Sequence, residues 1–451
     1  MPPSSASRTE RIYAVLSGDD AEDRSCTAIP DSACTNLPRN FLLNVANGAC
    51  TKLAEQLASP SLVLPWLMAT VGAPAGFAGF LMPLKQAGGL LPQMAVAGTI
   101  RGVAVRKWFW VGAGAAQAVL LALIVLLGLS LAGLGLSGSG AGLTVVVLFA
   151  AFATASGVGS VAFQDVTGKT VPKGLRGRML SQRASIGGGL TLVAALLMTS
   201  LIGMDASADV GMTPVLALIA VAAVLWAAAA LLFALIAEDP GATEGGRNII
   251  REFAAGIGLW RKVPGFRRYI WARSALIVIE ISTPFFALHG REAGGSGFGD
   301  LGLFVLGVGI ANVVSSPVWG KLSDRSSRQV MRYACLFAAA AVIAALSIEA
   351  LLEGQPAVFA YVAVFVLIGL AEAGVRTGRK TYLVDAAPAN DRPLYVAFSN
   401  TLVGGLALPI GAIGLIGQTY GASAVLAAVL AATVLAYLLV TAMPEAEDMT
   451  A

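Results

Sequence analysis

The chain has few charged residues and long stretches without any. Only 12% of its 451 residues are Asp, Glu, Lys or Arg, whereas soluble globular domains carry about 25%. The hydrophobic share is 57% and the mean hydropathy is +0.77. This composition excludes an ordinary soluble protein and predicts a chain that lies in a membrane.

Histidine and cysteine are scarce as well. The sequence has one histidine, His289, and its four cysteines stand at positions 26, 34, 50 and 335. That spacing matches neither a zinc motif nor a disulfide framework. We therefore interpret Cys26 and Cys34 as ordinary thiols and expect no metal and no cofactor. His289 is either an interfacial polar residue or a pH sensor.

Catalytic motifs are missing, although two short stretches imitate them. The sequence contains neither His-Glu-x-x-His nor Gly-x-Ser-x-Gly. Residues 163–170 end like a phosphate-binding loop, but Phe163 stands where the first glycine is required. Residues 297–300 resemble part of an intramembrane aspartyl protease motif, yet Asp300 is better explained as a helix N-cap. We expect no ATP binding and no enzyme.

Twelve apolar segments approach or exceed the ~20 residues that a helix needs to cross a ~30 Å hydrocarbon core. They are residues 40–64, 74–99, 107–132, 142–164, 184–204, 213–236, 268–290, 299–321, 330–350, 357–377, 394–417 and 421–441. The sequence therefore predicts an all-α membrane protein with twelve transmembrane helices.

Polar stretches divide this pattern into parts. We expect a cytoplasmic tail at residues 1–38, a six-helix bundle at 39–237, a cytoplasmic linker at 238–267, a second six-helix bundle at 268–442 and a tail at 443–451. The first tail lacks the apolar core of a signal peptide and should be partly ordered at most. Within the linker, Ile249–Trp260 has the pattern of an amphipathic helix at the membrane surface.

Basic residues predict the orientation in the membrane. Loops on the same side as both termini contain residues 101, 106, 107, 169, 173, 176, 178, 183, 321, 325, 328, 332, 376, 379, 380 and 392, all Lys or Arg. The opposite loops contain only Arg291. Because cytoplasmic loops are enriched in Lys and Arg, both termini should be cytoplasmic, in a multi-pass protein of the cell (inner) membrane.

The two halves carry an internal repeat. A pattern of Pro, Arg and Gly-Gly-Leu occurs twice with a shift of 216 residues: Pro172, Arg176 and Gly188-Gly189-Leu190, then Pro388, Arg392 and Gly404-Gly405-Leu406. Both copies fall between equivalent spans, the fourth and fifth of each half. Parallel repeats of six spans are a known way to build a transporter.

A short loop between the eighth and ninth spans gives the most specific signal. It contains Gly320, Asp324, Arg325 and Arg328, and this spacing resembles the signature loop of the major facilitator superfamily of transporters. The first-half copy, residues 98–107, lacks the acidic residue. The resemblance implies two six-helix bundles that rock about a central cavity, with spans one, four, seven and ten lining it and the loop residues acting in gating.

Charged and amide side chains within the spans are the candidate site, because a charge near the bilayer centre costs about 2.5–3.5 kcal/mol on insertion scales. They are Asn44, Asn47, Lys52, Glu55, Lys85, Gln86, Arg273, Glu280 and Glu372. One interpretation is a substrate and proton pathway. The other is static pairing, above all between Lys52 and Glu55, that only holds helices together.

We expect a secondary active transporter that moves a small organic solute by alternating access, coupled to protons. Glu55, Glu280 and Glu372 are the candidate proton carriers, since removal from water favours the neutral carboxyl form. Lys52 and Lys85 favour an anionic substrate. The expected partners are this substrate and membrane lipids, not nucleic acid, and the protein should be a monomer. The alternatives are a drug or lipid efflux permease of the same fold, or a receptor or assembly partner that transports nothing.

Overall fold

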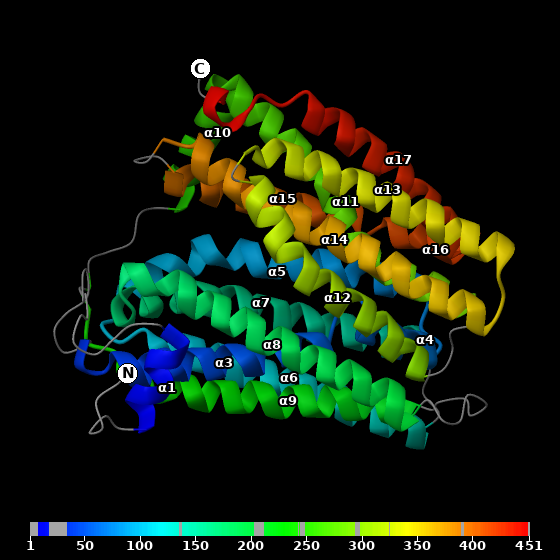
Figure 1. Cartoon of the computed structure of the whole chain (residues 1–451), viewed down its shortest axis with the longest axis horizontal. Helices are drawn as coiled ribbons and strands as arrows, with labels where there is room; N and C mark the ends of the chain where they lie inside the picture. The colour runs from blue at the N-terminus through cyan, green and yellow to red at the C-terminus, as the bar shows by residue number, and fades with distance from the viewer. Residues whose placement is uncertain are drawn as a thin grey trace.

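The computed structural model is built almost entirely of helices (Figure 1). It describes residues 8–17, 34–134, 138–202, 212–241, 243, 249–293, 298–323, 325–388 and 392–449. The helices of the first half are α1 (Arg8–Ser17), α3 (Leu37–Leu57), α4 (Val63–Thr70), α5 (Ala75–Arg101), α6 (Lys107–Leu134), α7 (Ser139–Thr170), α8 (Lys173–Ile202) and α9 (Met212–Ala234). Then follow α10 (Ile249–Lys262), α11 (Pro264–Glu292), α12 (Phe298–Ser323), α13 (Ser327–Leu351), α14 (Gln355–Ala386), α15 (Arg392–Ile410), α16 (Ile413–Tyr420), α17 (Ala422–Thr441) and the 3-10 turn η1 (Ala446–Asp448).

Each of the twelve predicted spans coincides with a helix or with a broken pair of helices. Nine helices in the described part of the chain are long and apolar enough to cross a membrane. The first span is divided into α3 and α4 around Pro60, which has no N–H group for a helical hydrogen bond. The eleventh is divided into α15 and α16 just after Pro409. An all-α membrane protein with the expected order of spans is confirmed.

The helices form two packed groups that follow the order of the chain (Figure 1). In the first group α3 packs on α8 and α9, α5 on α7, and α6 on α7 and α9. In the second, α14 packs on α12 and α13, and α17 on α11 and α13. The groups meet where α5 lies against α15 and α16 and where α8 lies against α12. Any cavity that both halves share must therefore lie along these contacts.

Glycine permits a close contact between the halves. A Cβ atom on Gly79 of α5 would lie 2.9 Å from the Cα atom of Gly414 of α16, so a larger residue would force the helices apart. This contact lies at the end of the molecule opposite to the two termini. At the same end Arg291 donates a hydrogen bond of 3.3 Å to the carbonyl oxygen of Trp66 and lies over its ring. The two halves are thus packed together at this end.

The polar segments contain two further helices. Helix α10 appears where the linker pattern predicts an amphipathic helix, and its Gly256 packs on Phe398 of α15. Helix α1 lies in the N-terminal tail, where Tyr13 is buried edge-on against Phe41 at 5.3 Å between ring centroids. Cys34 is disulfide-bonded, so its interpretation as an ordinary thiol was wrong; Cys26 lies outside the described residues.

Candidate functional site

Helix α3 places an ion pair halfway along the first span. The Nζ atom of Lys52 lies 2.8 Å from Oε2 of Glu55, one turn further along the helix. The two side chains keep 51% and 39% of their surface accessible. Two accessible charges at this depth must border a space that water can enter, because charges facing hydrocarbon are costly.

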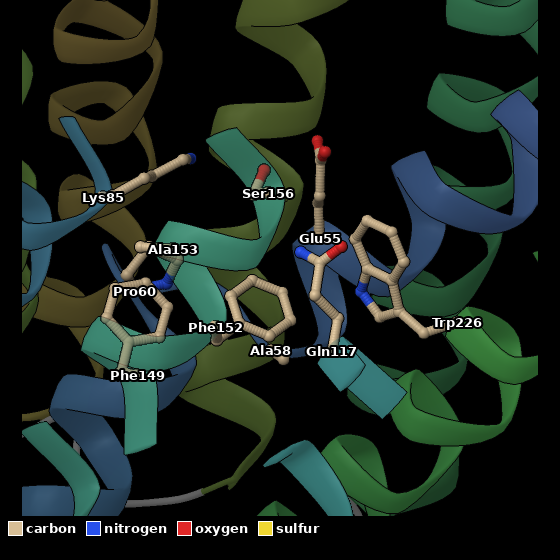
Figure 2. Close-up of a pocket in the computed structure, with 10 residues that line it drawn as sticks. All are labelled: Glu55, Ala58, Pro60, Lys85, Gln117, Phe149, Phe152, Ala153, Ser156 and Trp226. Atoms are coloured by element: carbon tan, nitrogen blue, oxygen red, sulfur yellow. The ribbon is translucent and has the colours of Figure 1, made fainter. Parts of the chain in front are cut away.

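Glu55 also borders a pocket inside the first half (Figure 2). Its lining comes from α3, α5, α6, α7 and α9 and from the segment that joins α3 to α4: Glu55, Ala58, Pro60, Lys85, Gln117, Phe149, Phe152, Ala153, Ser156 and Trp226. Glu55 and Lys85 line the same pocket. Lys85 makes no ion pair with any residue that the structure describes. Lys52 and Glu55 thus form a pair, and Lys85 lies across the pocket from it.

The second half contributes a carboxylate that is tied to both halves. Glu280 of α11 is 7% exposed. Its Oε1 atom lies 3.3 Å from Nη2 of Arg379 on α14, and its Oε2 accepts a hydrogen bond of 3.0 Å from Nε2 of Gln86 on α5. Gln86 thus reaches from the first half to a charge of the second.

Two further predicted residues bind partners within the second half. Glu372 of α14 accepts a hydrogen bond from the hydroxyl of Thr283 on α11. Arg273 of α11 is 4% exposed and donates hydrogen bonds to Ser399 and, at 2.7 Å, to Oδ1 of Asn400 on α15. Arg273 therefore links α11 to α15 through hydrogen bonds to two neutral side chains.

Charges from the two halves lie within electrostatic range of one another. The charge of Lys85 interacts with the charges of Glu55 and Lys52 in the first half. It also interacts with those of Glu372 and Arg376 in the second half. The charge of Lys380 on α14 likewise interacts with those of Lys52 and Glu280. On α3, α5, α11 and α14 this cluster holds five cations and three carboxylates: Lys52, Lys85, Arg376, Arg379 and Lys380 with Glu55, Glu280 and Glu372. Among these interacting charges, the cations outnumber the carboxylates by two.

Asn44 and Asn47 do not line this space. Both are fully buried, and Nδ2 of Asn47 donates to the carbonyl oxygen of Ala229 on α9 at 2.9 Å. Nδ2 of Asn44 donates to the carbonyl oxygen of Asn40. Arg183 of α8 donates to Oδ1 of Asn47 at 3.2 Å and to the carbonyl oxygen of Asn44. The Asn47 amide thus joins α3 to α8 and α9, the Asn44 amide bonds within α3, and neither side chain is accessible in this conformation.

The structure describes only part of the predicted gating loop. Gly320 lies in α12, Arg325 is exposed, and Asp324 lies outside the described residues. Arg328 binds the C-terminal segment instead, with Nη2 2.7 Å from Oε1 of Glu445 and Nη1 2.7 Å from the carbonyl oxygen of Met443. Nothing in the sequence indicated this partner.

A similar arrangement occurs at the corresponding place in the first half. There the carboxylate of Glu238, just after α9, accepts hydrogen bonds from the backbone N–H groups of Arg106 and Lys107 and from Nζ of Lys169 at 3.0 Å. Arg106 also pairs with Asp165 of α7 at 2.5 Å. In each half, an acidic residue after the last helix thus holds the start of the third span.

Sequence reasoning missed several residues of the site. Arg376, Arg379 and Lys380 were assigned to the end of a span or to a loop, but α14 continues to Ala386 and carries them along the shared space. Gln117 and Trp226 were missed entirely. A signal for Gln117 was present, since an amide in the apolar run 107–132 requires a partner. Among the described residues no cluster of possible metal ligands occurs.

Two six-helix groups around a polar space are the architecture of a membrane transporter, and comparison with known proteins identifies its family. The model of the Major Facilitator Superfamily matches residues 46–412 and 281–448. The chain belongs to this superfamily. A curated relative, "Uncharacterized protein Rv2209" of Mycobacterium tuberculosis, is 26% identical over 277 residues, which are 60% of this chain and 52% of the relative. The chain thus spans about half the length of the curated relatives that it matches.

Solved structures show the same fold at low identity. A variant of the nucleoside transporter NupG aligns with a TM-score of 0.65 and 13% identity, covering 89% of this chain and 99% of that one. A D-xylose-proton symporter aligns with a TM-score of 0.63 and 14% identity, covering 91% and 99%. At these identities the likeness supports the fold and leaves the substrate open.

Proposed function

We propose that the protein is a proton-coupled secondary transporter of small organic anions. Membership of the Major Facilitator Superfamily and the likeness in fold to solved transporters support a transporter with a small-molecule substrate. The anionic class is supported by one observation, the surplus of cations over carboxylates between the halves. An anion that enters this space is attracted by the unmatched charge, and the attraction is stronger there than in bulk water.

Proton coupling follows from the Lys52–Glu55 pair. When Glu55 is ionised it holds Lys52 at 2.8 Å. Protonation of Glu55 removes that attraction, releases Lys52 and raises the positive charge of the space by one. An anion then binds more strongly, so proton binding and substrate binding favour each other. Glu280 and Glu372 are the corresponding carboxylates of the second half.

The alternating-access cycle that we propose uses the contacts between the halves. The end that is closed by Gly79 and Gly414 would be the outer end, with both termini in the cytoplasm and the protein a monomer in the cell membrane. The loop with Gly320, Asp324, Arg325 and Arg328 would act as a gate on the cytoplasmic side. In this cycle, the two six-helix units would divide at the linker 238–267.

Thermal stabilisation and flux measured with matched compounds test the proposal. Lactate, succinate and benzoate would each be compared with the corresponding uncharged amide, on purified protein and on proteoliposomes. The proposal predicts that at least one anion raises the melting temperature and enters in a saturable manner, while its amide does neither. Transport of amides or apolar compounds alone would indicate an efflux permease. Binding without flux would indicate a receptor.

A further inference from the structure

The pocket behind Glu55 contains hydrogen-bond donors that the protein leaves without partners. Gln117 of α6 is 2% exposed and Trp226 of α9 is 5% exposed. The Nε2 atom of Gln117 and the Nε1 atom of Trp226 are both buried and have no hydrogen-bond partner among the described residues. Buried donors are normally satisfied, so two in one pocket require an occupant.

The walls of the pocket are aromatic. Phe149 and Phe152 of α7 stack with ring centroids 5.7 Å apart, and Phe152 meets Trp226 edge-on at 5.7 Å. Figure 2 shows Phe149, Phe152 and Gln117 below the ends of Lys85 and Glu55, with Trp226 beside Glu55. The pocket thus combines aromatic walls and free donors with one cation and one carboxylate.

All helices that line this pocket belong to the first half. Gln117 and Trp226 come from α6 and α9, which pack on each other. The pocket is therefore built by the first half alone, and its Lys85 also interacts with the charges of Glu372 and Arg376 of the second half. A molecule whose charge lies near Lys85 would have this pocket beside it.

We infer that this pocket is a subsite for the uncharged end of the substrate: a planar ring that carries a hydrogen-bond acceptor opposite to the anionic group. The inference rests on the proposed anion transport. The aromatic walls favour a flat ring. The free donors of Gln117 and Trp226 require an acceptor such as a carbonyl oxygen. Lys85 binds the anionic group. The substrate class is thus narrowed from small organic anions to aromatic acids with an acceptor at the far edge.

A pair of nearly isosteric compounds isolates the acceptor. 4-Acetylbenzoate has a carbonyl oxygen opposite its carboxylate, whereas 4-isopropylbenzoate has a methyl group in that position. Binding of each would be measured by calorimetry to the wild-type protein and to the variants Gln117→Leu and Trp226→Phe. The preference for the acetyl compound should fall about tenfold in each variant, which corresponds to ~1.4 kcal/mol.

Stability provides a second readout that a structural glutamine would not reproduce. Because Nε2 of Gln117 has no partner to lose, Gln117→Leu should leave the melting temperature unchanged or raise it. The matched control is Thr433→Val in α17, which removes another buried, unpartnered polar atom far along the chain from the pocket. This control should leave the preference between the two compounds unchanged.

The outcomes separate the subsite from the proposed function. If both variants still bind both anions and keep the preference for the acetyl compound, the subsite is overturned and anion transport stands. The donors of Gln117 and Trp226 would then be satisfied by water. Binding of neither compound, while the lactate or succinate of the first panel binds, would also overturn the subsite alone. If no anion of either panel binds, the proposed function fails and the subsite fails with it.

Discussion

Gln86 and Glu280 form a hydrogen bond that joins the two halves of the molecule, with Nε2 of Gln86 3.0 Å from Oε2 of Glu280. The same carboxylate faces Arg379 on α14. In a transporter whose halves rock, a contact between them is present in one conformation and broken in another. This bond is therefore expected to favour the conformation seen here.

Replacement of Gln86 by leucine should shift the balance between conformations. A hydrogen bond to a charged group contributes about 1.5–3 kcal/mol, and its loss would favour the state open at the end opposite to the termini. Spin labels at positions 130 and 352, near that end of α6 and α13, would report a longer distance. The control is Gln93→Leu on the same helix, because Gln93 binds Gly89 and Ser160 within the first half. Equal distances in Gln86→Leu and in the control would contradict the assignment.

Steric overlap at a glycine contact should also favour the state that is open at the end opposite to the termini. Gly79→Ala would place a Cβ atom 2.9 Å from Gly414 and 3.0 Å from Cζ of Phe285, and overpacking of this kind costs about 1–3 kcal/mol. The labelled distance across this end should increase. Gly89→Ala on the same helix meets no atom within 4 Å and should leave the distance unchanged. An unchanged labelled distance in Gly79→Ala would contradict this prediction. It would show that the two helices adjust without separating.

The two acidic residues that follow the last helix of each half should differ in their effect on stability. The Glu238 side chain is 0% exposed and accepts bonds from two backbone N–H groups and one lysine. Glu238→Gln should lower the free energy of unfolding by about 1.5–3 kcal/mol. The side chain of Glu445 is 37% exposed, and Glu445→Gln should cost at most about 1 kcal/mol. Thermal melts in detergent compare them, and a smaller loss for Glu238→Gln would refute the ranking.

The spans and the linker helix could be predicted from sequence because they depend on local properties. Apolar runs of sufficient length must be helical in a bilayer, where every backbone group needs an internal partner. The breaks near Pro60 and Pro409 could in principle also have been predicted, because proline has no N–H group for a helical hydrogen bond. The family could also be inferred, because the residues from Gly320 to Arg328 stand at the spacing of its signature loop.

The neighbours of each polar side chain could not be predicted. Spacing along α3 places Asn47 and Glu55 on roughly the same face but does not reveal that α9 covers the first and a pocket adjoins the second. Arg328 was identified only as part of the gating loop, yet it binds Glu445, more than 100 residues away. Such contacts depend on how helices cross, and small glycines such as Gly79 set these crossings by contacts distant in sequence.

The central claim is that Glu55 couples protons to an anionic substrate, and Glu55→Gln tests it most directly. The panel anion with the highest wild-type flux would be measured twice in proteoliposomes, once driven by a pH gradient and once as exchange without a gradient. Protein-free liposomes and melting temperatures serve as controls. A static Lys52–Glu55 pair would lower the melting temperature without a selective change in pH dependence. Our account predicts that the variant loses uptake driven by the pH gradient and keeps exchange near the wild-type rate, whereas gradient-driven uptake equal to that of the wild type would contradict it.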